Sequence, residues 1–289
     1  MPAHHAQRRP VAVANARHSP LCLRFAPRPD AFRARCAVAP EKLSGSELNA
    51  GRLPYAAPLR AAISWSAGKD ACLALLRARA AGLQVDRFVT MCEPDGLSKS
   101  HALPPELIAA QVAALGGDWQ PVRVPAGGYA AAFDATLAGL KAEGFDAMVF
   151  GDIDLQAHRD WLAPACERAG LQALFPLWGE PRAALAQAVI ASGIRARLVC
   201  VDTRWLDASF CGAAYDAALL ALLARLPAGV CPVGEDGEFH TVVLDAPGFA
   251  APLAVQDLPQ RRVATQPPWA PTVLVFQPLA WPAAASGAP

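Results

Sequence analysis

Short apolar segments rich in β-forming residues alternate, from Leu59 onward, with segments whose apolar residues recur at helical spacing. The strand-like segments read AAISWS, DRFVTMCE, WQPVRVP, FDAMVFGDI, LQALF, IRARLVCVD, FHTVVLD and TVLVFQPLA. Three helical segments begin at Lys69, Pro105 and about Tyr129. A further helix ends at about Ser192, and the last one spans roughly Ala213 to Leu226. This alternation is typical of parallel strands joined by right-handed crossovers. It predicts an α/β fold with a doubly wound, mostly parallel sheet whose ligands bind at the carboxyl ends of the strands.

The composition is that of a globular chain with one or two domains. The 289 residues are 54% hydrophobic and carry a net charge of +1. Because this net charge is close to zero, we expect no nucleic-acid partner. Apolar runs such as AALLALLARLPAGVCPVG are interrupted by Arg and Pro, so we expect no membrane protein. The eight cysteines form no CxxC pair and no zinc-type cluster, which predicts buried, reduced thiols in a cytoplasmic protein. The sequence indicates no oligomeric state.

The segment SAGKDA joins the first predicted strand to the first predicted helix. The backbone N–H groups of a first helical turn point outward, and the helix dipole adds partial positive charge, so such a turn is a natural seat for phosphate. It is not a Walker A loop, because Ile63 and Asp70 stand where that motif needs Gly and Ser or Thr. The simplest alternative is a capped helix start that binds no ligand.

This segment resembles the SGGxDS signature of the PP-loop ATP pyrophosphatases, which split ATP between the α- and β-phosphates. The resemblance implies that the residues of the turn bind the nucleotide: Ser66, Ala67, Gly68, Lys69 and Asp70. Gly68 lets the backbone approach the ligand, and Lys69 adds a cation. The chain departs from the signature at Ala67, where Gly is usual, and at Ala71, where Ser is usual. Ala67 restricts a backbone angle that Gly leaves free, and Ala71 lacks a hydroxyl.

Two further blocks, SHALPPELIAAQVAALG and FGDIDLQAHRDWLAPACERAGLQALFPLWGEPR, are similar to the diphthine-ammonia ligase family of that superfamily. The similarity implies nucleotide contacts from Ser100 and His101, with Ala102 in place of a usual Gly. Gly151 and Asp152 lie just past the fourth predicted strand. At this place we expect Gly151 to let the backbone approach the nucleotide and Asp152 to bind Mg²⁺. The alternative is that Asp152 only caps the next helix.

The segment GEDGEFHTVVLDAPGF is similar to the C-terminal GExGEFHT element of the same family. Its carboxylates around a glycine turn concentrate negative charge, which is costly unless cations or a cationic substrate offset it. The resemblance implies a substrate-binding run of consecutive residues: Glu235, Asp236, Gly237, Glu238, Phe239, His240 and Thr241. An acidic surface hairpin is the alternative, and His240 fits either the cleft or the core.

Together these resemblances imply an ATP-dependent amide-forming ligase that uses ATP and Mg²⁺. A carboxylate, on a small molecule or on a protein, attacks the α-phosphate and releases pyrophosphate, and ammonia then displaces AMP. The implied catalytic residues are Asp70, Glu238 and His240, and the implied metal ligand is Asp152. A catalytically weakened nucleotide-binding or regulatory protein is the alternative, favoured by the alanines within the motifs. A sulfur-transferring PP-loop enzyme fits less well, since the cysteine spacing offers no catalytic pair.

The predicted organisation has four parts. Residues 1–58 are rich in Arg, Pro, Ala and His without periodicity, so we expect a disordered or misassigned extension, although their Arg content also resembles a transit peptide. The PP-loop ATP-binding domain spans 59–200, and a smaller α+β substrate-binding part spans 201–258. A linker, a terminal strand and a tail make up 259–289.

Overall fold

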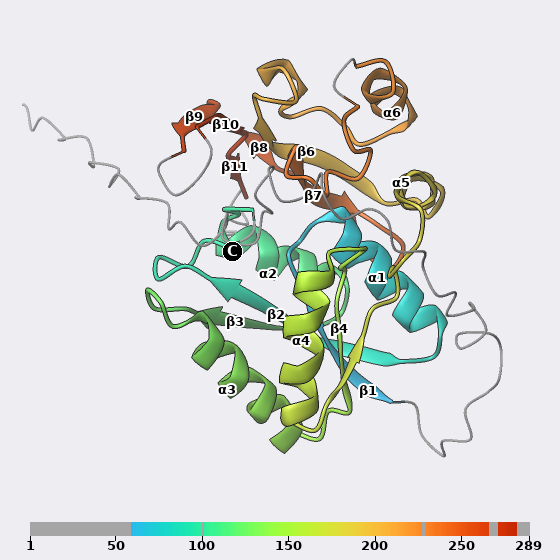
Figure 1. The fold of residues 1–289 in the computed structure, drawn as a ribbon, viewed down its shortest axis with the longest axis vertical. Coiled ribbons are helices and arrows are strands. Elements are labelled where there is room, and N and C mark those ends of the chain that lie inside the picture. The colour runs from blue at the N-terminus through green and yellow to red at the C-terminus, as the bar shows by residue number, and fades with distance from the viewer. Residues whose placement is uncertain (1–58, 100, 227–228, 266–270, 282–289) are drawn as a thin grey trace, which may run out of the picture.

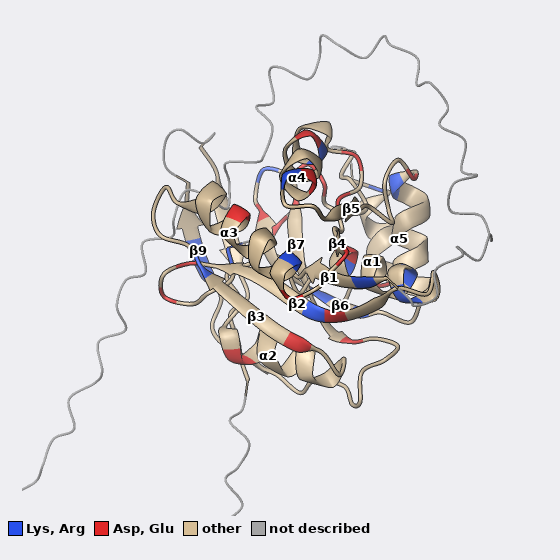
Figure 2. Ribbon diagram, turned by 90° about the horizontal axis from the view of Figure 1, so that it is seen from below, with Lys and Arg blue, Asp and Glu red and all other residues tan. Residues whose placement is uncertain are grey.

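The computed structural model of the chain describes residues 59–99, 101–226, 229–265 and 271–281 (Figure 1). The predicted extension at 1–58 and the tail from 282 lie outside these residues. Lys and Arg are interspersed with Asp and Glu along the described elements (Figure 2). No helix in the described ranges is long and apolar enough to cross a membrane. The cysteines within them are buried free thiols, as predicted.

Parallel strands form the main sheet. They are β1 (Arg60–Ser64), β2 (Gln84–Cys92), β3 (Asp118–Arg123), β4 (Ala147–Val149) and β5 (Gln172–Leu174), in the order β3-β2-β1-β4-β5. Every neighbouring pair is parallel, which confirms the predicted α/β class. The chain moves outward from β1 to β3 and then returns to β4 on the other side of β1. The switch point of the sheet, where open α/β folds bind ligands, therefore lies between β1 and β4.

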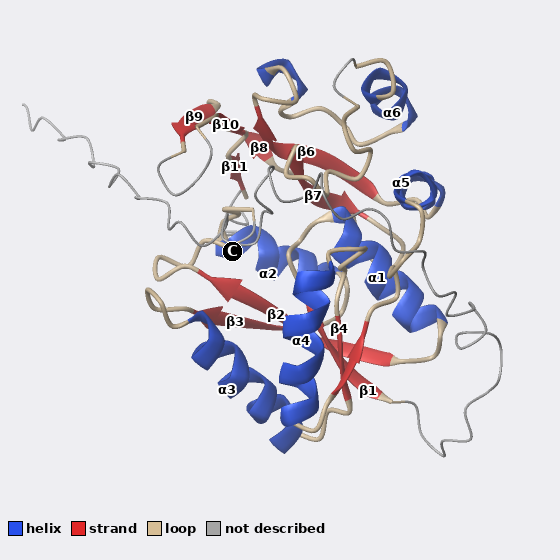
Figure 3. Ribbon diagram, in the orientation of Figure 1, coloured by secondary structure: helices blue, strands red, loops and turns tan. Residues whose placement is uncertain are grey.

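The helices that connect these strands cover both faces of the sheet (Figure 3). They are α1 (Lys69–Ala80), α2 (Pro105–Ala114), α3 (Tyr129–Ala142) and α4 (Gln156–Arg168), and their starts at Lys69, Pro105 and Tyr129 are as predicted. Residues of α1 and α2 share one core with Ala61 and Ile63 of β1, whereas those of α3 and α4 share another with Ala62. Successive strand residues thus point to opposite, equally buried faces.

The C-terminal part of the chain is smaller and of the α+β type, as predicted, and it contains an antiparallel sheet. This sheet consists of β6 (Arg195–Asp202), β7 (Phe239–Asp245), β9 (Arg261–Ala264) and β10 (Val273–Phe276), in the order β7-β6-β10-β9. A separate short pair is formed by β8 (Gln256–Asp257) and β11 (Leu279–Ala280). The helical elements of this part are α5 (Arg182–Ala191), the 3₁₀ turn η3 (Ala208–Phe210) and α6 (Ala217–Leu223).

This part of the chain differs in detail from the sequence expectation. The segment IRARLVCVD does not extend the parallel sheet, because β6 pairs antiparallel with β7 and β10. The predicted linker contains β9, and the last predicted helix is shortened to α6, since the Asp216 carboxylate accepts the Leu219 N–H and sets its start. Hydrophobic periodicity identifies a strand but not its partner. The predicted domain boundaries at residues 200 and 258 stay predictions.

The two sheets share a hydrophobic core and are joined by hydrogen bonds at the end of β1. The Ala67 carbonyl accepts the Val243 N–H of β7 at 2.9 Å. Fully buried Gln111 of α2 donates from Nε2 to the carbonyls of Ala67 at 3.2 Å and Val243 at 2.5 Å, and its Oε1 accepts the Trp65 indole N–H at 3.2 Å. One side-chain amide thus satisfies several polar groups inside an apolar region and fixes the loop after β1 to the second sheet.

Replacing Gln111 by Leu tests this connection. We expect Gln111→Leu to lower the free energy of unfolding by about 2–4 kcal/mol, because the Trp65 N–H and the Val243 carbonyl lose their buried partner. Urea unfolding measures the change. The matched control is Gln187→Leu on the exposed side of α5, where the change stays within about 0.5 kcal/mol. Equal effects of the two substitutions would contradict the assignment.

Candidate nucleotide and ligase site

The loop after β1 contains a non-glycine residue in the left-handed region. Ala67 has φ of 69° and Ala102 has φ of 52°, and these are the only non-glycine residues with positive φ in the part of the chain that the structure describes. They are also the two positions where the sequence places Ala for a usual Gly. The backbone therefore keeps the glycine-type conformation despite a side chain, at a cost of roughly 1–2 kcal/mol each.

Gly68 is the point of closest approach in the loop. A Cβ at this position would lie 2.7 Å from His101 Cε1 and 3.3 Å from the Thr241 carbonyl oxygen, so a side chain does not fit. The Gly68 N–H points to Ser66 Oγ at 3.3 Å. The loop, the His101 side chain and β7 thus meet around one glycine, while Ser100 lies outside the described residues.

Lys69 is turned toward residues 233–238 before β7, called the acidic segment below. Its ammonium lies 2.8 Å from Asp70 Oδ2 and donates to the Val233 carbonyl at 2.5 Å, and the residue is 2% exposed. Its backbone N–H donates to Thr241 Oγ1 at 3.2 Å. Lys69 therefore links the loop to the strand and segment that the sequence assigns to substrate binding.

Gly151 and Asp152 follow β4 and lie at the switch point. A Cβ on Gly151 would lie 2.8 Å from the Ala71 nitrogen, so the backbone after β4 packs directly against the first turn of α1. This contact accounts for the glycine at position 151. Asp152 Oδ1 lies 2.8 Å from His158 Nδ1 of α4, and both side chains are partly buried.

The turn before β7 is held by Glu238. This residue is 1% exposed, and its two carboxylate oxygens accept the N–H groups of Cys231 at 2.8 Å and Asp236 at 2.9 Å. Gly237 between them has φ of 86°, which explains the glycine. Burial raises the pKa of the Glu238 carboxyl. These hydrogen bonds show that the Glu238 side chain holds the turn in its conformation.

Glu235 carries the strongest sign of accumulated negative charge. Burial, together with the carboxylates of Asp70 and Asp154, raises its pKa to about 8, although Lys69 and Arg182 act in the opposite direction. Carboxylate oxygens gathered in this way are the donor set that Mg²⁺ prefers. Asp70, Asp154 and Glu235 thus offer the ligand type of the divalent cation that the motifs imply, whereas the group of ligand atoms that lies within 4.8 Å among the described residues is that of Cys231, Asp236 and Glu238.

Arg182 is a site residue that sequence analysis missed. Its guanidinium contacts both oxygens of Asp154 at 2.6 and 3.0 Å and Asp236 Oδ2 at 2.8 Å, and these bonds raise its pKa. Arg182 is the first residue of α5, where the helix dipole disfavours a cation, and that misfit is a signal the sequence contains. The guanidinium also lies 3.5 Å from Cys231 Sγ. Cys231, Asp236 and Glu238 converge as metal ligands do, but here an arginine supplies the positive charge.

His101 and His240 lie against each other beside the loop, with ring centroids 4.9 Å apart. Burial, with the charge of Lys69, lowers the pKa of His240 to about 4, and burial with His240 nearby holds the pKa of His101 well below its usual range. Both imidazoles are therefore neutral at neutral pH. The preceding Phe239 is buried against Tyr215, so alternation along β7 places His240 on the other side.

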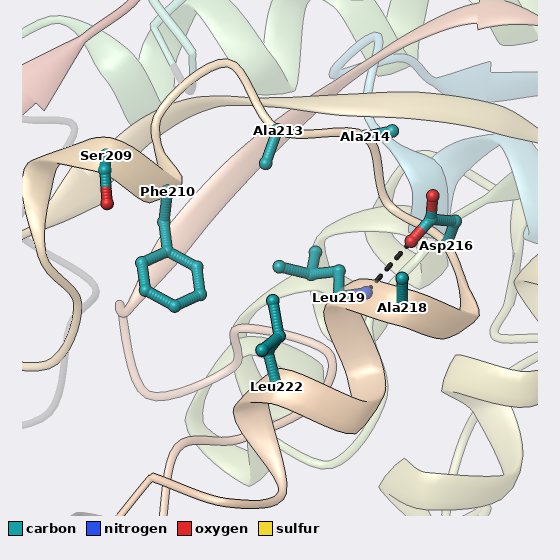
Figure 4. A pocket seen from close by; sticks show the side chains of 8 residues that line it. All are labelled: Ser209, Phe210, Ala213, Ala214, Asp216, Ala218, Leu219 and Leu222. Atoms are coloured by element: carbon teal, nitrogen blue, oxygen red, sulfur yellow. Dashed lines mark hydrogen bonds between the residues drawn. The ribbon is translucent and has the colours of Figure 1, made fainter.

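A surface pocket lies elsewhere. It has a volume of about 280 Å³ between η3 and α6 and shares no residue with the groups above (Figure 4). Phe210, Leu219 and Leu222 line it, and the Asp216 carboxylate on its wall is bonded to the Leu219 N–H. None of its lining residues belongs to the candidate site.

The strand order, the glycine-containing loop after β1 and the residues after β4 define a Rossmann-like α/β protein of the PP-loop class. Two family models match the chain: the diphthamide synthase N-terminal domain over residues 59–173 and the diphthamide synthase C-terminal domain over residues 181–266. The chain belongs to the diphthamide synthase family, that of the diphthine-ammonia ligases, which confirms the resemblance of its motifs. No curated protein matches the chain. Family membership implies a PP-loop ligase that uses ATP.

The left-handed alanines can be tested by mutation. Ala67→Gly and Ala102→Gly should each raise the free energy of unfolding by about 1 kcal/mol, because glycine removes the Cβ strain at positive φ. The matched control is Ala71→Gly in the first turn of α1, which should lower it by about 0.5–1 kcal/mol. Urea unfolding of the three variants measures the signs. A loss of stability in Ala67→Gly would show that the loop is not held in this conformation.

Glu235 should make stability depend on pH. A raised folded-state pKa favours the folded protein below the unfolded pKa, and that advantage is lost as pH rises toward about 8. The stability of Glu235→Gln relative to the parent should therefore increase between about pH 5 and about pH 9. Exposed Glu167→Gln on α4 supplies the baseline. A pH-independent difference for Glu235→Gln would contradict the charge cluster.

Proposed function

We propose that this protein is an ATP-dependent amide-forming ligase with the chemistry of a diphthine-ammonia ligase: it adenylates a carboxylate and transfers the acyl group to ammonia. One observation carries the proposal. The loop after β1, the residues after β4 and the acidic segment before β7 meet at the switch point of the sheet, joined by Gly68, Gly151 and Lys69.

In the first step, a carboxylate oxygen of the acceptor bonds to the α-phosphorus of ATP, and the bond to the β-phosphate oxygen breaks to release pyrophosphate. Ser66, Gly68 and the first turn of α1 bind the pyrophosphate half, because backbone N–H groups and the helix dipole favour an anion there. Mg²⁺, when bound, neutralises phosphate charge, and Asp70, Asp152 and Glu235 are the carboxylates that would hold it.

In the second step, the nitrogen of ammonia bonds to the acyl carbon, and the bond between that carbon and the AMP oxygen breaks. The proton lost from nitrogen needs an acceptor. His240 is the candidate, because its imidazole lies against His101 beside the loop after β1. Orienting the reactants and neutralising charge supply most of the barrier lowering in such transfers.

A nucleotide-binding protein without turnover is the second candidate. It is favoured by the contacts of Lys69, whose ammonium is bonded to Asp70 and to the Val233 carbonyl, away from an incoming phosphate. The glycine-type backbone angle of Ala67 is compatible with both candidates, because both need the loop to bind the nucleotide.

Asp70→Asn tests the proposal. We expect calorimetric titration with MgATP to show micromolar binding to the parent, about −8 kcal/mol, and at least a hundredfold weaker binding to the variant. Release of AMP and pyrophosphate should fall in parallel. Asp134→Asn, on the exposed face of α3, is the control and should match the parent.

The outcomes separate the two candidate functions. AMP and pyrophosphate released by the parent, with ammonium and a carboxylic acid present, support the ligase. MgATP binding without any AMP release across an acceptor screen supports the regulatory protein. Equal binding to Asp70→Asn and the parent would contradict the site.

A further inference from the structure

The turn that leads into α5 connects several parts of the candidate site. The Gly179 N–H donates to the Ile153 carbonyl at 2.8 Å, so this turn is bonded to the segment after β4. The Glu180 carboxylate binds the guanidinium of Arg77 on α1, where Nη2 and Oε2 lie 3.1 Å apart. α5 accordingly lies beside α1, the helix that starts at the nucleotide loop (Figure 1). The backbone from which the Arg182 side chain extends is therefore fixed relative to both β4 and α1.

The Arg182 side chain adds the acidic segment to this connection. Its Nε and Nη2 donate to the two carboxylate oxygens of Asp154 at 2.6 and 3.0 Å, and its Nη1 donates to Asp236 Oδ2 at 2.8 Å. Asp154 lies two residues after Asp152, and Asp236 directly follows Glu235. One guanidinium thus joins the loop assigned to nucleotide and metal to the segment assigned to the acceptor. Arg182, Asp154 and Asp236 are called the clamp below.

The shape of arginine suits the clamp. A guanidinium is planar and carries its N–H groups in a rigid fork, so it binds one carboxylate through two parallel bonds and still reaches a second carboxylate. A lysine ammonium is a point charge on a flexible chain and does not fix the angle between its partners. The clamp therefore sets both the distance and the orientation between the two segments.

The geometry of the clamp distinguishes it from an ordinary surface ion pair. The side chains of Arg182, Asp154 and Asp236 are 30%, 36% and 49% exposed, and isolated pairs with such exposure hold their partners weakly. A two-armed arginine bond within a network is the exception. Helix formation does not explain Arg182, because the dipole of α5 disfavours a cation in the first turn. The clamp thus serves to place two segments that lie outside α5.

We propose that Arg182 is a positioning residue of the ligase reaction, a proposal that rests on the proposed ligase function. The clamp holds the acidic segment, and the acceptor bound there, at the distance from the nucleotide that attack on the α-phosphorus requires. Arg182 acts through Asp154 and Asp236 rather than by contact with a reactant. Since a misplacement of about 1 Å lowers a rate by roughly a hundredfold, loss of the clamp should slow turnover. It should leave MgATP binding nearly unchanged, because the loop after β1 and α1 bind the pyrophosphate half.

Amide hydrogen exchange tests the positioning without any substrate. The turn before β7 contains hydrogen-bonded N–H groups, among them those of Cys231 and Asp236. In Arg182→Gln we expect mass spectrometry to show roughly tenfold faster exchange in this turn, because it loses its attachment to the loop after β4, while β2 keeps its rate. Arg168→Gln is the control, since it removes an exposed contact with Asp134 on α3 and should change neither rate.

Turnover and binding test the consequence for the reaction. AMP release from MgATP and ammonium is measured in the parent with a screen of acids that includes acetate, glycine and succinate, whose far ends are neutral, cationic and anionic. The acid that the parent uses fastest then serves for the variants. We expect Arg182→Gln to lower kcat by roughly tenfold or more and to keep the Kd for MgATP within about threefold of the parent. Arg182→Lys retains the charge without the fork, so its kcat should stay close to that of Arg182→Gln; recovery of the parent rate would overturn the proposal.

Asp236→Asn breaks the clamp from the other side and leaves Arg182 bonded to Asp154. It should reproduce both the faster exchange and the lower kcat, so a folding defect specific to Arg182→Gln would be recognised. The double variant Arg182→Gln with Asp236→Asn should be no more impaired than either single variant, because each removes the same connection. Additive losses in the double variant would show that the two residues act separately and would overturn the clamp.

The positioning role and the ligase function fail differently. Unchanged amide exchange in Arg182→Gln overturns the positioning role, whatever the turnover. AMP release at the parent rate in Arg182→Gln also overturns it and leaves the ligase function standing. If exchange becomes faster in Arg182→Gln but the parent releases no AMP with any acid of the screen, the ligase function fails, and with it the role of Arg182 in the reaction, while the clamp stands as a part of the fold.

Discussion

The carbonyl oxygen of Ala67 is the point on which the site depends. It accepts the Val243 N–H at 2.9 Å and the Gln111 amide at 3.2 Å, and these bonds hold a loop residue whose φ of 69° is strained for alanine. A parallel sheet alone would leave this turn without such support. Because β7 supplies it, the nucleotide loop and the acidic segment are parts of one structural unit.

The same junction organises the charges. Lys69 is bonded to Asp70 of α1, and Arg182 is bonded to Asp154 after β4 and to Asp236 before β7. Burial, together with the carboxylates of Asp70 and Asp154, still raises the pKa of Glu235 to about 8. The carboxylates in this region are of the ligand type that Mg²⁺ prefers.

The sequence predicted the parallel sheet, the starts of its helices and the segments that meet at its edge. It did so because strand and helix periodicities are local properties, and because ligand loops follow the strands of such sheets. The antiparallel pairing of β6 depends on distant partners and was not predictable in this way. The hydrogen bonds of Gln111 could not be predicted for a similar reason. A single polar residue in an apolar helix does not indicate which distant groups it will bond. The positive φ angles of Ala67 and Ala102 were indicated by the family motifs, which usually have glycine at these two positions.

The transfer of oxygen tests the central claim most directly. If a carboxylate attacks the α-phosphorus, one carboxylate oxygen must leave with AMP when ammonia forms the amide. Mass spectrometry of AMP formed from MgATP, ammonium and an acceptor whose carboxylate is labelled with oxygen-18 should therefore show one labelled oxygen in AMP and unlabelled pyrophosphate. AMP without label, or label in orthophosphate beside ADP, would contradict adenylation at this site.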